Sequence, residues 1–250
     1  MREGEGVSLA ELVDERRGLE ELADRLTAGD PGSRDVVDAA YRRWFGLTCA
    51  ERRAVGDPGA WLADAVRALA PRPAPSGPVD APGAADTSAC RVLREALVTL
   101  SPAERAQFVL NDVFGALPRG PRSRPVPHGE HDTVVHAVRD ACERADAAGL
   151  EAVLAENVTA LYDSGGKVRA RTRPADGPRE AARSLLTLLP PRADVTMAPR
   201  SVNGRTALLV HYRGRVAAII SLTVADGRAT QLWVTVNPDK LRPWNRNARP

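Results

Sequence analysis

This chain of 250 residues is 43% hydrophobic and 27% charged, a composition typical of globular proteins with one or two compact units. No apolar run reaches the ~20 residues of a membrane span, and the acidic N-terminus lacks the apolar core of a signal peptide. We therefore expect a cytoplasmic protein without membrane contact. The three scattered cysteines predict reduced thiols, and we expect no metal site and no cofactor.

The net charge of +3 is unevenly distributed. Residues 1–117 hold 14 of the 35 basic and 19 of the 32 acidic side chains and net to −5, whereas residues 118–250 net to +8. DNA-binding modules usually present a basic face, because neutralisation of phosphates supplies much of their affinity. The front part of the chain lacks that charge.

Residues 1–70 are predicted to be helical. A leucine stripe at helical spacing covers 9–28, and residues 29–32 interrupt it before a second helix over 33–47, which Ser33 can cap. A third helix begins at residues 57–58. Three arginine pairs are predicted to lie on helix surfaces that face solvent: Arg16-Arg17, Arg42-Arg43 and Arg52-Arg53.

The middle of the chain alternates linkers with helices. Residues 71–88 contain five prolines and no apolar periodicity, which is typical of a linker. Residues 89–117 predict two helices, and the second opens at Ser101 with a capping box. Residues 118–127, rich in Pro and Arg, form a second predicted linker.

From residue 128 the pattern changes. Helices are predicted over 130–147, 150–156 and 177–189, and strands over 158–162, 193–199, 205–212, 215–225 and 228–236. Arg213-Gly214 and Asp226-Gly227 lie where hairpins need positive φ. Helices followed by an antiparallel meander predict an α+β cone over 128–242, in which a curved sheet wraps round its helices, with a tail over 243–250.

Two motifs and one turn in this region resemble a known family. They are Asp163-Ser164-Gly165-Gly166-Lys167 after the first strand, Val202-Asn203-Gly204-Arg205 before the meander, and Asn237-Pro238-Asp239-Lys240-Leu241 at its end. They resemble extracytoplasmic-function sigma factors that carry a C-terminal SnoaL-like extension. In that family D-G-G-G-K and N-P-D-K-L mark the extension; here the first reads D-S-G-G-K. The resemblance implies a SnoaL-like, cystatin-like cone.

The front part resembles the same family more faintly. Residues 35–44 are similar to the helix of sigma region 2 that faces RNA polymerase, and 57–62 to the start of the next helix. Residues 100–115 are similar to the first helix of region 4. The resemblance implies a degenerate region 2 over 1–70 and a partial region 4 over 89–117. It also implies a vestige of the polymerase-facing surface at Tyr41, Arg42, Arg43 and Trp44.

The departures from the family concern DNA reading. After Phe114-Gly115 the family continues into a helix-turn-helix, whereas here residues 116–118 lead straight into the second linker. Such a reader needs its second helix in the major groove. The basic stretch that follows Trp61 in the family is reduced to Arg67 and Arg72. We therefore predict no specific DNA binding.

We predict that the two motifs lie together and contact the N-terminal helices or a partner, since each places an acid and a base beside Gly or Pro. The alternative is a pair of ordinary turns, in which glycines supply positive φ and an Asx-Pro turn ends the sheet. The predicted contact residues are Asp163, Gly165, Gly166, Lys167, Asn237, Pro238, Asp239 and Lys240.

A candidate pocket inside the cone would be lined by Tyr162, Met197, His211, Tyr212 and Trp233. Strands alternate their faces, so His211 and Tyr212 cannot both point inward, and the alternative is plain core. An acid/base enzyme needs a desolvated carboxylate or histidine, and His211 is the single titratable candidate on the central strands. We name no catalytic residue, and enzymatic activity stays open.

Two functions follow from these patterns. The first is a degenerate sigma-factor-like regulator of transcription that binds core RNA polymerase or another regulator through protein contacts, without reading a promoter. The alternative is a SnoaL-like protein that binds a small apolar ligand, or a cyclase- or isomerase-type enzyme, with a helical accessory region. A fragment that begins near Pro125 holds all the strands and two long helices, so we expect it to fold alone.

Overall fold

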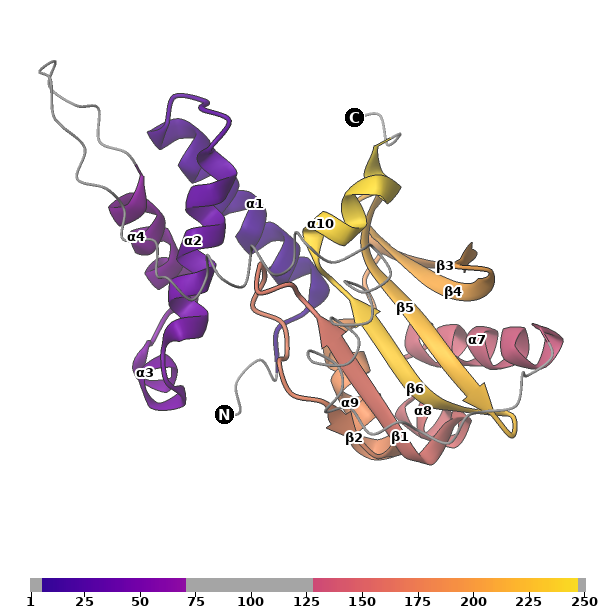
Figure 1. The fold of residues 1–250 in the computed structure, drawn as a ribbon. Coiled ribbons are helices and arrows are strands. Elements are labelled where there is room, and N and C mark those ends of the chain that lie inside the picture. Colours follow the sequence, from indigo (N-terminus) through magenta and orange to yellow (C-terminus); the bar gives the residue numbers. More distant parts are fainter. Residues whose placement is uncertain (1–5, 71–127, 247–250) are drawn as a thin grey trace, which may run out of the picture. The chain divides into compact units, whose positions relative to one another are not determined.

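The computed structural model describes residues 6–70 and 128–246 (Figure 1). The predicted linkers over 71–88 and 118–127, the helices over 89–117 and residues 247–250 lie outside the described residues. Both described stretches belong to one unit of the chain, which runs over Met1–Pro71 and Pro125–Pro250. None of the described helices combines the length and hydropathy that a membrane span requires.

Four helices form the N-terminal region. They are α1 (Leu9–Leu26), α2 (Ser33–Gly46), α3 (Cys49–Ala54) and α4 (Pro58–Leu69). Ser8 and Glu11 form a capping box at the start of α1, and the Asp57 side chain accepts from the Ala60 amide at the start of α4. Helix α3 was not predicted because none of its six residues is buried, although Thr48 and Glu51 give it a capping box.

The second region begins with α7 (His128–Glu143), α8 (Ala147–Val153), β1 (Leu154–Asp163), β2 (Ala175–Asp176) and α9 (Pro178–Leu188). The meander follows as β3 (Val195–Val202), β4 (Arg205–Tyr212), β5 (Arg215–Ala225) and β6 (Arg228–Thr235), then α10 (Pro238–Leu241) and the 3-10 helix η2 (Arg242–Asn245). The helix predicted over 150–156 begins and ends about three residues earlier, because Asp146 caps it through the Gly149 amide at 2.9 Å.

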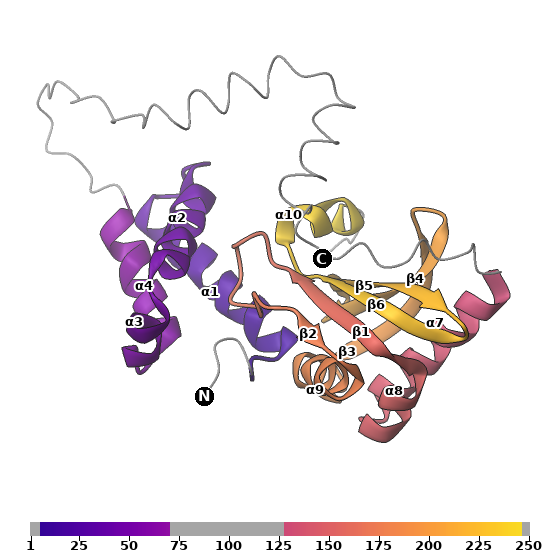
Figure 2. The same ribbon diagram turned by 60° about the horizontal axis from the view of Figure 1, so that its bottom comes forward.

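The six strands form one sheet in the order β2-β1-β6-β5-β4-β3. All neighbours are antiparallel except β1 and β6, which run parallel with Asp163 opposite Thr235. Figure 2 shows α7, α8 and α9 on one side of the sheet and α10 on the other. The predicted α+β class, with N-terminal helices followed by a curved antiparallel sheet, is confirmed.

The meander is joined by three tight turns with positive φ at both central residues: Asn203-Gly204 (51° and 78°), Arg213-Gly214 (49° and 76°) and Asp226-Gly227 (51° and 68°). This geometry matches the twist of antiparallel strands and favours glycine at the second position. The predicted turns at 213–214 and 226–227 are confirmed, and the bounds of β4 and β5 agree with those predicted.

Helix α1 takes part in two hydrophobic cores. Its first turns bury Leu9, Ala10 and Leu12 among residues of the sheet and of α7 and α9. Its later turns bury Leu19 and Ala23 in a separate core with α2 and α4. One continuous helix therefore joins the N-terminal bundle to the cone, and it fixes where the two motifs meet the helices.

Candidate functional site: the contact between the N-terminal helices and the two motif loops

The loop after β1 is a tight turn that needs its glycines. Gly165 and Gly166 have φ of 59° and 66°, in the left-handed region. The Gly165 amide donates to Asp163 Oδ1 at 3.0 Å, and the Gly166 amide donates to Ser164 Oγ at 3.2 Å. These bonds turn the chain so that Lys167 leaves the loop close to α1 and α2.

The loop after β6 packs against this turn. Asn237 is buried and caps α10, with its Oδ1 accepting from the Asp239 amide at 3.1 Å, and Pro238 occupies the first turn of that helix. A Cβ on Gly165 would lie 2.3 Å from Asn237 Nδ2. The loops meet because β1 and β6 are parallel neighbours, so both strands end at the same edge of the sheet.

Ion pairs connect the two loops with each other and with α2. Lys167 Nζ lies 2.5 Å from Asp38 Oδ2 and 2.6 Å from Asp239 Oδ2. Hydrogen bonds to Asp239 and Asp38 raise the pKa of Lys167, and the same ammonium lowers the pKa of Asp239. Lys240 Nζ lies 2.9 Å from Asp163 Oδ2, an ion pair at an oxygen that accepts no well-aligned hydrogen bond from the described residues.

Arg16 is the centre of the contact on α1. It is 8% exposed, and its guanidinium donates to Glu20 Oε1 at 2.8 Å, Asp38 Oδ1 at 2.9 Å and the Lys167 carbonyl at 2.7 Å. The prediction that Arg16 solvates a helix surface is wrong. It occupies the buried stripe of α1 between Leu12 and Leu19, and its charge is accommodated because all three partners converge on it.

A second pair joins α1 to the cone on another side of the helix. Arg169 donates to both carboxylate oxygens of Glu15, with Nε at 3.0 and 2.9 Å, and the buried Tyr41 hydroxyl donates to the same carboxylate at 3.1 Å. Burial, followed by the charge of Glu15, raises the pKa of Tyr41, so this hydroxyl stays a donor. The Arg169 guanidinium also lies 5.9 Å from the centroid of the Trp44 ring.

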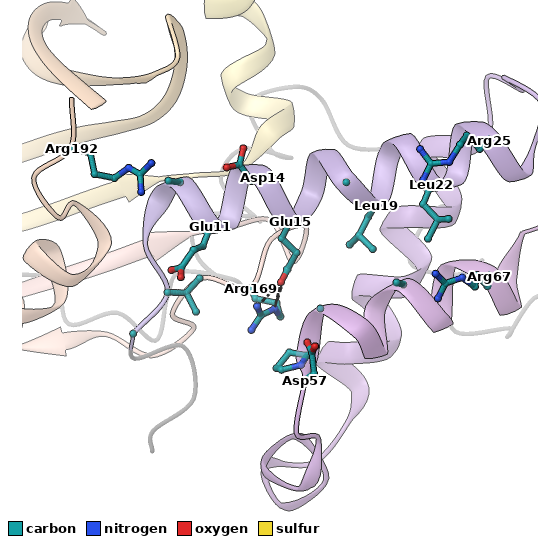
Figure 3. Close-up of a pocket in the computed structure, with 17 residues that line it drawn as sticks. Glu11, Asp14, Glu15, Leu19, Leu22, Arg25, Asp57, Arg67, Arg169 and Arg192 are labelled. Atoms are coloured by element: carbon teal, nitrogen blue, oxygen red, sulfur yellow. Dashed lines mark hydrogen bonds and ion pairs between the residues drawn. The ribbon is translucent and has the colours of Figure 1, made fainter. Parts of the chain in front are cut away.

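The Glu15–Arg169 pair borders a groove of about 690 Å³ along α1, α4 and the cone (Figure 3). Its charges balance, because four carboxylates and four guanidiniums line it: Glu11, Asp14, Glu15, Asp57, Arg25, Arg67, Arg169 and Arg192. A balanced lining gives the groove no preference for a charged ligand.

The four residues predicted to face a polymerase divide into two pairs. Tyr41 and Trp44 are buried in the core of α1, α2 and α4, where the Trp44 and Trp61 rings meet edge to face at 5.3 Å. Arg42 and Arg43 are exposed. A partner that approaches α2 therefore meets the arginines, while the aromatic rings support the helix from inside.

The five candidate pocket residues do not line one cavity. Tyr212 faces the main core, and its hydroxyl donates to Asp14 Oδ2 at 2.6 Å, which raises its pKa. His211 and Trp233 alternate with residues of that core and so lie on the opposite face of the sheet. Met197 lines an open pocket of about 390 Å³ with Cys142, Leu189 and Val195, whereas the Tyr162 hydroxyl pairs with Ser184.

Four residues of the contact were not singled out in the sequence as contact residues: Glu15, Arg16, Asp38 and Arg169. Asp38 and Arg16 are 22 residues apart, and Arg169 and Glu15 are 154 apart. No local pattern links such residues. The available signal was the stripe Leu12–Arg16–Leu19–Ala23, which places an arginine at the helical spacing of buried positions.

Substituting Gly165 by alanine tests how tightly the two loops pack. We expect G165A to lower the free energy of unfolding by about 2–3 kcal/mol, because left-handed strain adds to a clash with Asn237. The matched control is G166A, which shares the positive φ but whose Cβ would meet nothing closer than Phe45 at 4.0 Å, so it should cost about 1 kcal/mol. Urea denaturation measures both. Equal losses would mean that the loops do not depend on the close approach at Gly165.

Comparison with known proteins yields one curated relative and several solved structures. No family model matches the chain. The chain is 25% identical over 296 aligned positions to the "ECF RNA polymerase sigma factor SigJ" of Mycobacterium tuberculosis (strain ATCC 25618 / H37Rv), covering 94% of this chain and 93% of the relative.

Two of the similar solved structures are the M. tuberculosis extracytoplasmic function sigma factor SigJ and a putative ketosteroid isomerase from Kribbella flavida DSM 17836. The first is 24% identical, covers 94% of this chain and 98% of that chain, and has a TM-score of 0.38. The second is 12% identical, covers 43% and 78%, and has a TM-score of 0.33. The resemblance seen in the motifs thus extends along the sequence: over nearly its whole length this chain is homologous to an extracytoplasmic-function sigma factor and is a sigma-factor-like protein.

Proposed function

We propose that this protein is a regulator of transcription that acts through protein contacts, binding core RNA polymerase with its N-terminal helices without reading promoter sequence. The observation that carries the proposal is the packing of α2. Its Tyr41 and Trp44 are buried against α1 and α4, while Arg42 and Arg43 stay exposed on the helix that resembles the polymerase-facing helix of the family. The curated relative is named an RNA polymerase sigma factor, which supports the choice of partner.

Two observations support the loss of promoter reading. In the sequence, residues 116–118 lead from Phe114-Gly115 into a Pro- and Arg-rich stretch where a recognition helix would have to begin. In the comparison, the 296 aligned positions outnumber the 250 residues of this chain, so parts of the relative have no counterpart here. A protein without a recognition helix has no element to place against base edges in the major groove.

In this proposal the two motif loops hold the helices in place on the cone. Lys167 pairs with Asp38 on α2 and with Asp239 on the other loop, and the Lys167 carbonyl accepts from Arg16 on α1. Paired charges of this kind set orientation more than they add affinity. The cone thus presents the outer face of α2 in a fixed direction.

The test is affinity capture of purified core RNA polymerase by the full chain. We expect the wild type to capture polymerase and the double variant R42E/R43E to bind at least ~10-fold more weakly, because reversed charges meet a surface complementary to arginine. The matched control is R200E/R205E, which makes the same charge change on two exposed arginines of the β3–β4 hairpin.

A DNA arm completes this test. Footprinting of a defined promoter without polymerase should give no protected region, since specific complexes usually exceed non-specific binding by roughly 10³-fold or more. Failure of the wild type to capture polymerase, equal losses in both double variants, or a sequence-specific footprint would each overturn the proposal.

A second candidate function is the binding of a small apolar molecule in the cone. The open pocket beside Met197 and Cys142, about 390 Å³ and bordered also by Glu143 and Arg192, falls within the range of small-ligand pockets. Burial raises the pKa of the Cys142 thiol in this pocket to about 12, so the thiol stays protonated, which favours binding over catalysis. Among the described residues, no carboxylate is fully buried. Titration with an apolar fluorophore tests this function, and equal binding by M197K would exclude this pocket as its site.

A further inference from the structure

A cleft of about 530 Å³ lies where α1, the start of β5 and the C-terminal helices α10 and η2 meet. Its charge is one-sided, unlike that of the groove in Figure 3. Two carboxylates, Glu20 and Asp239, face six guanidiniums: Arg16, Arg17, Arg34, Arg215, Arg242 and Arg246. The cleft therefore carries a positive excess that the rest of the contact does not share.

Half of these arginines are already neutralised. Arg16 pairs with Glu20 and Asp38, Arg242 donates to Asp239 at 2.8 Å, and Arg17 lies 3.6 Å from Asp14. The other three are exposed and have no carboxylate partner among residues 6–70 and 128–246: Arg34, Arg215 and Arg246. Three guanidiniums from three different segments, each without a carboxylate partner in the described ranges, thus face one cleft.

The backbone that presents these arginines is held firmly. The Asn245 side chain clamps Val216, accepting from its amide and donating to its carbonyl, both at 2.9 Å, and so ties η2 to β5. On the other wall, the bond from the Tyr212 hydroxyl to Asp14 ties β4 to α1. The cleft is a feature of the folded scaffold, and its arginines need only small side-chain adjustments to meet a ligand.

Between the arginines the wall is partly apolar, beside the polar side chain of Asn245. Val13, Val168, Val216 and Val236 line it, together with Leu241. A ligand that fills the cleft therefore needs a charged part for the rim and a flat or apolar part for the wall. The volume of about 530 Å³ suits a small molecule, since such pockets usually measure about 300–1,000 Å³.

We propose that this cleft binds a small organic polyphosphate, of the class of nucleoside di- and triphosphates. The phosphates would meet Arg34, Arg215 and Arg246, whose planar forks can donate two parallel hydrogen bonds to phosphate oxygens. The base and sugar would lie on the valine wall. The charge of such a ligand, about −3 to −4, is opposite and similar in size to that of the three guanidiniums without a carboxylate partner in the described part of the chain.

A single-stranded nucleic acid fits the same cleft less well. Proteins that bind such strands stack successive bases on exposed aromatic rings along a basic groove. The single aromatic residue in the lining is Tyr212, and its ring lies under two guanidiniums, Arg213 at 4.9 Å and Arg192 at 6.0 Å from its centroid. The exposed Trp244 is outside the lining. These observations favour the small polyphosphate.

The test is titration of the full chain with a guanosine triphosphate that carries a fluorescent ribose label, followed by competition with inorganic pyrophosphate. We expect saturable binding that pyrophosphate displaces and that rising salt weakens. The double variant R215A/R246A should bind at least ~10-fold more weakly, because two charge-assisted hydrogen-bond donors are lost. The matched control R200A/R205A removes the same charge from the β3–β4 hairpin and should bind like the wild type.

Three outcomes would overturn the inference. The first is the absence of saturable binding by the wild type, and the second is an equal loss in both double variants. The third is binding of a single-stranded oligonucleotide with an affinity that grows with its length while the labelled nucleotide does not bind. Circular dichroism of each variant verifies that the fold is intact. None of these results depends on polymerase, so this inference can fail while the proposed function stands.

Discussion

Replacing Arg16 by methionine is expected to lower the free energy of unfolding by about 3–5 kcal/mol, because it leaves buried partners without their charge. Asp38 would keep only Lys167, and the Lys167 carbonyl would lose the donor that now lies 2.7 Å away. The methionine side chain fills much of the same volume, so the loss reports on the charge and not on a cavity. Urea denaturation of the full chain, followed by tryptophan fluorescence, measures it.

The neighbouring residue provides the control. Arg17 has a side chain that is 41% exposed and lies 3.6 Å from Asp14, so R17M should cost less than about 1 kcal/mol. A double variant, R16M/D38N, removes both members of the buried pair and should cost less than the sum of its single changes. If R16M is as mild as R17M, the ion pairs at α2 do not hold the helices on the cone.

Arg16 also shows where sequence reasoning stops. The position of Arg16 in the buried stripe of α1 was visible in the sequence. However, an arginine at such a position usually lays its methylene groups along the apolar surface and keeps its guanidinium in water. Whether it can be buried depends on partners 22 and 151 residues away. Those partners reach Arg16 because α1 packs against α2 and because Lys167, in the loop after β1, bonds to it, an arrangement that no local periodicity encodes.

The elements with strong local signals were predicted well. β4 and β5 end at Arg213-Gly214 and Asp226-Gly227, and both pairs adopt positive φ that confines the turn to two residues. The short elements had weak signals: β2 has two residues, and α10 reads in the sequence as an Asx-Pro turn. Helices α1, α2 and α4 were recognisable from their apolar stripes. Asp57 caps α4, but Ser33, which was expected to cap α2, is the first residue of that helix and makes no cap.

The closeness of the two motif loops follows from a pairing that was not predicted. A meander was expected after α9, but β1 was not assigned a neighbour. In the structure β1 lies beside β6 and runs parallel to it, so Lys167 and Asp239 emerge at the same edge. Parallel pairing between strands far apart in sequence depends on the whole fold, and the motif residues alone could not reveal it.

The same pairing logic limits the candidate pocket. The alternation of faces predicted that His211 and Tyr212 point to opposite sides, but it could not show which of them points inward; in the structure Tyr212 joins the main core, and His211 and Trp233 lie on the other face. The pairing register also decides which side chains are neighbours. Between β4 and β5 this register shifts by one residue after Val210. The sequence could place these residues on strands. Which of them border a cavity depends on how the helices pack against the sheet, and the strand pattern does not reveal that packing.

Replacing Leu12 by alanine is expected to lower the free energy of unfolding by about 2–5 kcal/mol. Leu12 is 1% exposed and lies in the core of the cone, together with Leu9 and Ala10. The loss should appear in the cone itself, because α1 closes that core. This differs from the sequence-based expectation that a fragment from Pro125 folds alone: the fragment lacks α1 and would leave the apolar surface that Leu9 and Leu12 cover facing water.

The matched control for L12A is L26A on the same helix. Leu26 is 39% exposed and ends α1, so the same change there removes little buried surface and should cost less than about 1 kcal/mol. Circular dichroism and an apolar dye compare the fragment over 125–250 with the full chain, and we expect the fragment to bind dye and to melt without a cooperative transition. A cooperative melt of the fragment, or equal costs for L12A and L26A, would show that α1 rests on a cone that is complete without it.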